Sequence, residues 1–353
     1  MTVSMTPDQK MTRSTEPKGA GQKRAIVHLG LNKTGSTAIQ EWLRVNADAL
    51  AEQGFYYDAF EDSMGGQWPQ ASLIAAAALR SDDANLLADF RAAHGIISPE
   101  DHAAHSHRME TMFAASLAQA EDKTVILSSE TLGVWATMKG LVGPVCDFLR
   151  RYFDEFTLVT YVREQADWLA SAYTQAVKMG RFHDINTFAA ERGVNDYDQF
   201  ARSWSQEAAP EGTLTLRLYE RESLIRRDVV EDFAATCGID TRGLQKLAPQ
   251  NEAISAREVR VLEILMRLEK RFGRLPLAPR AKHRSIARRF KGRRTYALSQ
   301  GMAHHIRALN ADSNERVRQR YFPDRPVLFA NLEPHVAHSA SIKISEPHEN
   351  TGT

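Results

Sequence analysis

The sequence predicts an α/β protein with a three-layer arrangement, in which helices flank a mostly parallel central sheet. Short, continuous apolar runs rich in β-branched residues are typical of buried strands. Four such runs occur, at 25–29, 124–127, 156–162 and 214–218. Long segments with helical signals separate them, and strands that alternate with helices form parallel sheets.

The run Ala25–Leu29 is the first predicted strand, and a glycine-containing turn leads from it into a helix. Apolar residues lie on one face of that helix, at Ile39, Trp42 and Leu43. The connection from Leu29 to Thr124 is long and contains helical stretches at 70–80 and 99–120. We therefore expect a helical insertion there that builds part of a substrate site.

Later in the chain, the run 156–162 precedes a predicted helix at Gln165–Met179, which Gly180 closes at a C-cap position. An amphipathic pattern from Ser255 to Phe272 predicts a helical C-terminal part. We see no internal repeat and no clear linker, so the sequence predicts one domain over 24–337. Polar segments flank it, and we expect a disordered tail at 1–23 and a flexible tail at 338–353.

Charge and cysteine content limit the function. Lys and Arg total 45 against 44 for Asp and Glu, so any anion-binding site must be local.

Cys146 and Cys237 lie far apart without metal-type spacing, which favours a reducing, cytoplasmic compartment. The longest apolar stretch, Ala71–Leu79, is shorter than the roughly 20 residues of a membrane span, and we expect neither a span nor a secretory signal.

A polar residue follows each predicted strand, namely Lys33 after a short turn, then Glu130, Arg163 and Glu220. In open parallel sheets, ligands bind outside the carboxyl ends of the strands. We therefore expect these four side chains to converge on one crevice.

The strongest motif is the stretch His28–Thr37, between a predicted strand and a predicted helix. A helix N-terminus offers unpaired backbone N–H groups and about half a positive charge, which together bind phosphate. Lys33 adds a full charge, and the Ser36 and Thr37 hydroxyls add donors. The lysine precedes the second glycine, unlike the G-x-x-x-x-G-K-[ST] pattern, which points away from ATP and magnesium. The alternative is an ordinary turn with a surface lysine.

This loop resembles the 5′-phosphosulfate loop of the sulfotransferases, on the residues Lys33, Thr34, Gly35, Ser36 and Thr37. The stretch 28–40 is similar to bacterial members that resemble carbohydrate sulfotransferases. Tyr161-Val162-Arg163, followed by Ser171, resembles the 3′-phosphate motif of the same family. Arginine can bind phosphate with two hydrogen bonds, although a salt bridge from Arg163 to Glu164 or Asp167 is the alternative.

The resemblance covers about 24–329 and implies a phosphate-loop nucleotide-binding type of fold. It also implies transfer of a sulfuryl group from 3′-phosphoadenosine 5′-phosphosulfate (PAPS) to the hydroxyl of a small-molecule or carbohydrate acceptor, with Lys33 stabilising the departing phosphate oxygen. The alternatives are a phosphate-loop kinase or nucleotide hydrolase, and a non-catalytic nucleotide-binding protein. The sequence leaves the oligomeric state open.

Two residues are candidates for the general base. Glu130 follows a strand at the expected edge, but it could instead cap the next helix or pair with an arginine. His28 stands at a strand end, where a packed, hydrogen-bonded side chain is the alternative. Related families carry an acid shortly after the first helix, and this sequence departs from that pattern near Phe55–Tyr57.

Two other polar clusters receive simpler interpretations. His102 and His105 share a helix face that His107 does not, so we expect a solvated face and no metal site. The segment 271–294 is rich in Arg and Lys and has no acidic residue. It is either a solvated face, or a lid over the donor phosphates that could also attract an anionic acceptor. Few aromatics are interleaved for base stacking, so nucleic acid is not an expected partner.

Overall fold

A computed structural model describes residues 23–58, 95–129, 132–182, 184–247, 254–272 and 280–330. At its centre is a five-stranded, wholly parallel sheet with the order β2-β3-β1-β4-β5. The strands are β1 (Arg24–Leu29), β2 (Phe55–Tyr57), β3 (Thr124–Ser129), β4 (Glu155–Val162) and β5 (Gly212–Leu218). The predicted α/β class and the parallel sheet are confirmed.

Two apolar cores lie on opposite faces of this sheet and define the three layers. Ile26 of β1 packs with helices α1 (Ser36–Val45), α2 (Ala47–Glu52) and α11 (Val229–Thr236). Val27 lies in the other core, to which the helices α5 (Pro99–Ala120), α6 (Leu132–Lys139), α7 (Val142–Tyr152) and α10 (Tyr197–Ala208) contribute. Successive residues of a strand point to opposite faces, which explains the division.

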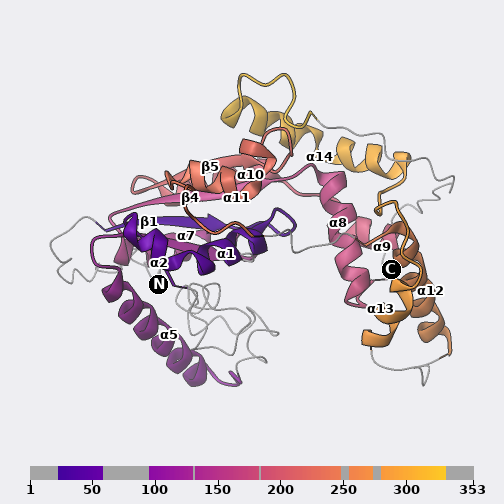
Figure 1. Ribbon diagram of the computed structural model, residues 1–353, viewed down its shortest axis with the longest axis horizontal. Helices are drawn as coiled ribbons and strands as arrows, with labels where there is room; N and C mark the ends of the chain where they lie inside the picture. The colour runs from indigo at the N-terminus through magenta and orange to yellow at the C-terminus, as the bar shows by residue number, and fades with distance from the viewer. Residues whose placement is uncertain are drawn as a thin grey trace, which may run out of the picture.

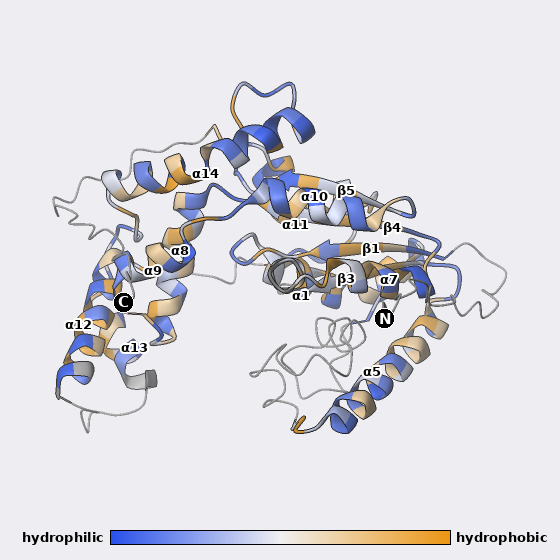
Figure 2. Ribbon diagram, turned by 180° about the vertical axis from the view of Figure 1, so that it is seen from behind, coloured by the Kyte–Doolittle hydropathy of each residue, from blue (hydrophilic) through white to orange (hydrophobic). Residues whose placement is uncertain are grey.

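A group of helices beside the sheet has its own apolar core, and we call it the helical lobe. It contains α8 (Gln165–Lys178), α9 (Ile185–Arg192), α12 (Ala256–Phe272), α13 (Arg280–Arg288) and the first half of α14 (Gln300–Tyr321). Figure 1 shows α8, α9, α12 and α13 gathered to one side of β1, β4 and β5. Figure 2 shows that these helices carry both hydrophobic and hydrophilic residues, as partly buried helices do.

Helix prediction was most accurate where capping signals are strong. Helix α5 begins and ends where expected. Its start is well defined because Ser98 and Asp101 form a capping box there and Pro99 occupies the first helical position. The amphipathic pattern from Ser255 corresponds to α12. The stretch 70–80 lies outside the described residues, as do 1–22 and 331–353, so the predictions for the insertion and for both tails remain predictions.

The histidines of α5 correct one expectation. His102 and His105 are buried, whereas His107 is exposed. The predicted division between the two faces is therefore right, but the shared face of His102 and His105 is not solvated. Among the residues that the structure describes, no group of three or more His, Cys, Asp or Glu side chains could hold a metal ion.

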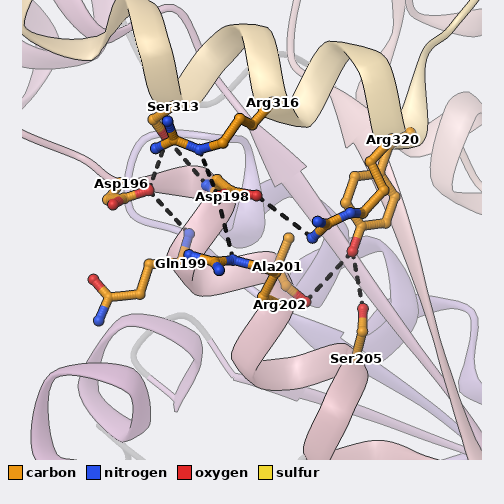
Figure 3. Close-up of polar contacts among 10 residues, drawn as sticks. Asp196, Asp198, Gln199, Ala201, Arg202, Ser205, Ser313, Arg316 and Arg320 are labelled. Atoms are coloured by element: carbon orange, nitrogen blue, oxygen red, sulfur yellow. Dashed lines mark hydrogen bonds and ion pairs between the residues drawn. The ribbon is translucent and has the colours of Figure 1, made fainter.

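A buried carboxylate joins α10 to α14, as Figure 3 shows. Asp198 is fully buried and pairs with Arg316 at 2.8 Å and Arg320 at 3.5 Å from α14. Arg202, one turn along α10, lies 3.2 Å from the same carboxylate. The Asp198 backbone N–H donates to the Ser313 hydroxyl. This network holds α14 against the sheet-flanking layer.

We expect Asp198→Asn to lower the free energy of unfolding by about 2 kcal/mol, because three arginines lose their shared counter-charge. The arginines are each about half exposed, which keeps the loss below that of a fully buried pair. Thermal unfolding should show a melting temperature about 4 °C lower. Asp240→Asn, which removes an exposed ion pair with Arg242, is the control and should leave the melting temperature unchanged. Equal melting temperatures for the two variants would contradict the stabilising role of Asp198.

In the part of the chain that the structure describes, we find no helix with the length and apolar character that crossing a membrane requires.

Candidate functional site

The turn between β1 and α1 has a backbone that requires glycine. Gly35 forms the N-cap of α1 with φ 85°, in the left-handed region. A Cβ atom there would lie 2.8 Å from Cγ1 of Val229 and 3.1 Å from the ring of Tyr219. Lys33 also has a positive φ, 69°. The turn is therefore tight and packed closely against α11 and the end of β5.

The hydroxyls of this turn differ in their roles. Thr34 Oγ1 donates to the Leu31 carbonyl at 2.5 Å, and Ser36 Oγ approaches the same oxygen at 3.4 Å. Both side chains are buried, so their hydroxyls hold the turn in this structure, whereas Thr37 is exposed. Because Gly35 supplies no side-chain cap, the first N–H groups of α1 have no side-chain acceptor at the N-cap. Such groups can bind an anion.

The two sequence motifs meet in space although 130 residues separate them. Arg163 follows β4, and its Nη1 donates to the backbone carbonyl of Lys33 at 3.0 Å. Its guanidinium lies over the ring of Tyr219, 5.5 Å from the centroid. Glu164 caps α8 and pairs with Arg307 at 3.3 Å. The predicted cationic pair therefore lies at one edge of the sheet.

Strand order explains why these two residues meet. β1 and β4 are neighbours. From β1 the chain continues to β2 and β3, on one side of this pair, and from β4 it continues to β5, on the other side. Such a switch point leaves a crevice at the carboxyl ends of the strands, where ligands bind in open α/β sheets. Lys33 and Arg163 flank this point.

One face of α8 is turned toward the same turn. Trp168 Nε1 donates to the Asn32 carbonyl at 2.9 Å, and Lys33 Nζ donates to Gln175 Oε1 at 2.6 Å. Ser171 lies between Trp168 and Gln175 with spacings of three and four residues, so it occupies the same helix face. A charged phosphate oxygen is a stronger acceptor for an ammonium group than a neutral amide, so Lys33 could exchange Gln175 for an anion.

Three residues beside Lys33 and Arg163, namely Trp168, Gln175 and Tyr219, were not predicted from the sequence. The spacing of residues 168, 171 and 175 was a signal, since it places them on one helix face. Which way that face points depends on tertiary packing. Tyr219 directly follows β5, and its ring lies beside both Gly35 and the guanidinium of Arg163.

His28 does not line the crevice and is a correction to the candidate bases. Its side chain is fully buried in the core beneath α1 and α11, with its ring centroid 5.3 Å from that of Phe233. Nδ1 lies 2.8 Å from Oγ of Ser128. Burial lowers the pKa of this imidazole to about 4, so it is neutral at physiological pH. The alternative of a packed, hydrogen-bonded histidine fits this placement.

The buried His28 predicts a loss of stability in mild acid. The pKa falls from 6.5 in the unfolded chain to about 4 in the folded protein, so protons bind preferentially to the unfolded state between these values. We expect His28 to lower the free energy of unfolding by about 2 kcal/mol between pH 7 and pH 5. Urea unfolding of wild type and His28→Asn at both pH values measures this contribution. If the free energy of unfolding falls equally in both proteins between pH 7 and pH 5, the loss does not come from His28.

Glu220 is a second correction, because it does not join the crevice. Its carboxylate accepts from Arg325 at 2.8 Å, from the Ser223 hydroxyl at 2.7 Å and from the Ala330 backbone N–H at 2.7 Å. It therefore anchors the C-terminal segment to the end of β5. Glu130 lies outside the described residues, so its role remains a prediction.

Two further features lie at the sheet edges. Asp58 follows β2 at the carboxyl edge and accepts from the Ser116 hydroxyl of α5 at 2.6 Å. A hollow of about 930 Å³ lies at the opposite edge, where residues such as Arg24, Gly54, Glu155 and Glu211 line it. Ligand sites of parallel sheets lie at carboxyl ends, so this hollow is not part of the candidate site.

No protein-family model matches the chain. It is similar to an uncharacterized protein of Archaeoglobus fulgidus, with 33% identity over 85 residues, which are 24% of this chain and 22% of that protein. Among solved structures, it is similar to a sulfotransferase from Alicyclobacillus acidocaldarius, with 13% identity, a TM-score of 0.40, and coverage of 74% of this chain and 98% of that one. It is also similar to the sulfotransferase domain of the Synechococcus PCC 7002 olefin synthase, with 15% identity, a TM-score of 0.32, and coverage of 78% and 97%.

Proposed function

We propose that this protein is a sulfotransferase that uses PAPS as its donor and a hydroxyl group, on a carbohydrate or a sugar-containing metabolite, as its acceptor. The contact between Arg163 and the Lys33 carbonyl carries this proposal, because it brings a cationic turn and a second cation to one crevice. PAPS has two anionic groups on one nucleoside, and two separate cationic anchors suit such a ligand.

Each anchor receives one end of the donor in this proposal. The N-terminus of α1, Lys33 and the exposed Thr37 bind the 5′-phosphosulfate, since helix N–H groups and an ammonium favour anions. Arg163 and Ser171 bind the 3′-phosphate through a guanidinium and a hydroxyl. Thr34, Gly35 and Ser36 shape the turn that presents these groups. The donor pattern fits the ligand without a metal in any step.

The transfer is an in-line displacement at sulfur. The acceptor oxygen forms a bond to sulfur while the bond from sulfur to the 5′-phosphate oxygen breaks, and adenosine 3′,5′-bisphosphate leaves. Lys33 donates to the departing oxygen as its negative charge develops. Glu130 is the proposed base for the acceptor proton, because it is the next residue in the sequence after Ser129, where β3 ends.

Transfer of label from ³⁵S-PAPS tests this function. The protein is incubated with labelled donor and a panel of hydroxylated compounds, carbohydrates included, and with an extract of the source cells. We expect labelled product together with an equal amount of adenosine 3′,5′-bisphosphate. Hydrolysis of ATP in place of sulfuryl transfer would favour a phosphate-loop hydrolase. Tight donor binding without transfer to any acceptor would favour a non-catalytic protein.

A further inference from the structure

The helical lobe carries a concentrated positive surface, which we call the basic face. Its members are exposed cations of α12 and of the segment that ends and follows α13, namely Arg257, Arg260, Arg267, Arg271, Arg288, Arg289, Lys291, Arg293 and Arg294. The whole chain has a net charge of only +1. The basic face is therefore a local concentration of charge that the rest of the chain offsets.

The spacing of these residues on α12 places them on one side of the helix. Arg257, Arg260, Ile264, Leu268 and Arg271 follow one another at intervals of three or four residues. At 1.5 Å per residue, this stripe is about 21 Å long. The stripe is turned away from the lobe core, since α12 contributes Val259 and Leu262 to that core.

The segment after α13 continues the same surface. The Gly292 N–H donates to the Ser255 hydroxyl at 2.9 Å, and the Ala256 N–H donates to the Arg294 carbonyl at 2.9 Å. A Cβ atom on Gly292 would lie 3.2 Å from Cδ of Arg257. The sequence from Arg288 to Arg294 is thus fixed beside the start of α12.

The acidic residues of α12 are turned inward. Glu258 accepts from Ser255, Glu263 accepts from the Tyr173 hydroxyl at 2.5 Å, and Glu269 lies 3.2 Å from His283. From 271 to 294 the sequence contains no acidic residue at all. Glu263 also lies 3.9 Å from Arg267 of the basic face. Cations therefore outnumber carboxylates on this surface.

Apolar side chains stand among these cations. Phe290 is 53% exposed between Arg289 and Lys291, and Ile264 and Leu268 of the stripe are 52% and 38% exposed. Ile264 and Leu268 are one turn apart on α12, and contiguous exposed apolar side chains mark interaction surfaces. Cations attract anionic lipid headgroups, and aromatic and aliphatic side chains enter the boundary with the acyl chains.

We propose that the basic face docks this protein on the surface of an anionic phospholipid bilayer. The cations supply the attraction to lipid phosphates, and Phe290, Ile264 and Leu268 enter the interface. A soluble polyanion would account for the cations but not for the exposed apolar side chains, so a bilayer accounts for both sets. This docking is peripheral, and it does not depend on the proposed sulfotransferase activity.

Co-sedimentation of the full-length protein with vesicles tests the proposal. We expect binding to vesicles in which about a third of the phosphatidylcholine is replaced by phosphatidylserine, and little binding to phosphatidylcholine alone. Raising the salt from about 0.1 M to about 0.5 M should release most of the protein, because surface charges are then screened. Failure to bind the anionic vesicles at low salt would overturn the proposal.

Two variants separate charge from apolar insertion. The double variant Arg288→Ala with Arg289→Ala should weaken binding about 25-fold, because each basic residue near an anionic surface contributes about fivefold. Phe290→Ser should weaken it several-fold and leave its salt dependence unchanged. The matched control, Arg242→Ala with Lys246→Ala, removes two exposed cations from another part of the molecule and should bind as wild type does. Melting curves confirm that each variant is folded.

Heparin serves as a probe for the competing partner, a soluble polyanion. One result would be weaker heparin retention in the arginine variant but not in Phe290→Ser. If wild type and Phe290→Ser also bound vesicles equally, the apolar side chains would contribute nothing to binding. That combination would overturn the bilayer proposal in favour of a soluble anionic polymer. Vesicle binding that falls in both variants supports the bilayer.

Discussion

Lys33→Ala is expected to lower the kcat of sulfuryl transfer by about 100- to 1,000-fold, the effect of removing one well-aimed donor from a developing negative charge. The fold should survive, because the Lys33 ammonium donates to Gln175 near the surface, and the contact from Arg163 to the Lys33 backbone carbonyl does not need the side chain. Initial rates with saturating ³⁵S-PAPS measure the change, and melting curves verify the fold.

Lys123→Ala is the matched control for this variant. Lys123 pairs with Glu121 at the start of β3, at the amino edge of the sheet and away from the proposed site. We expect its turnover to equal that of wild type. Near-normal turnover of Lys33→Ala would reject the assignment of Lys33, whatever the control does.

Arg163→Ala should weaken the binding of PAPS about 10- to 100-fold, because a charge-assisted contact to phosphate is lost. The sharper expectation concerns adenosine 5′-phosphosulfate, which lacks the 3′-phosphate. Wild type should bind this compound much more weakly than PAPS, whereas Arg163→Ala should bind the two with similar affinity. Calorimetric titration of both nucleotides measures the ratio.

The ratio separates two roles of Arg163. Its guanidinium also holds the Lys33 carbonyl, so the variant could loosen the turn and weaken both nucleotides together. An equal loss for both, with the preference for PAPS intact, would mean that Arg163 only positions the turn. Arg44→Ala, which removes an exposed pair with Glu41 on α1, is the control and should change neither affinity.

The sequence predicted the parts of the fold and site that have local signatures. The β1–α1 turn could be found because glycine, lysine and hydroxyl residues follow a buried strand, and Arg163 could be found because it ends another. Strand β2 was missed because it has only three residues, Phe55–Tyr57, two of them only partly buried. A run this short carries no periodicity that could distinguish a strand from a loop.

Tertiary packing decided the remaining roles. Glu220 and Arg163 have the same local pattern, a polar residue at the end of a strand. β4 is central, however, whereas β5 is the edge strand, and the C-terminal segment reaches Glu220 there. His28 is polar in the sequence, but alternation along β1 turns it into the core with Phe233. The direction of the α8 face that holds Trp168 and Gln175 depends on the same packing.

The central claim is that Lys33 and Arg163 hold a single nucleotide with anionic groups at both its 3′ and 5′ ends. Isothermal titration of the protein with adenosine 3′,5′-bisphosphate tests it most directly. We expect one molecule bound per chain, with an affinity that falls in both Lys33→Ala and Arg163→Ala and that exceeds the affinity for ATP with magnesium. Binding that neither substitution weakens, or a preference for ATP with magnesium, would contradict the account.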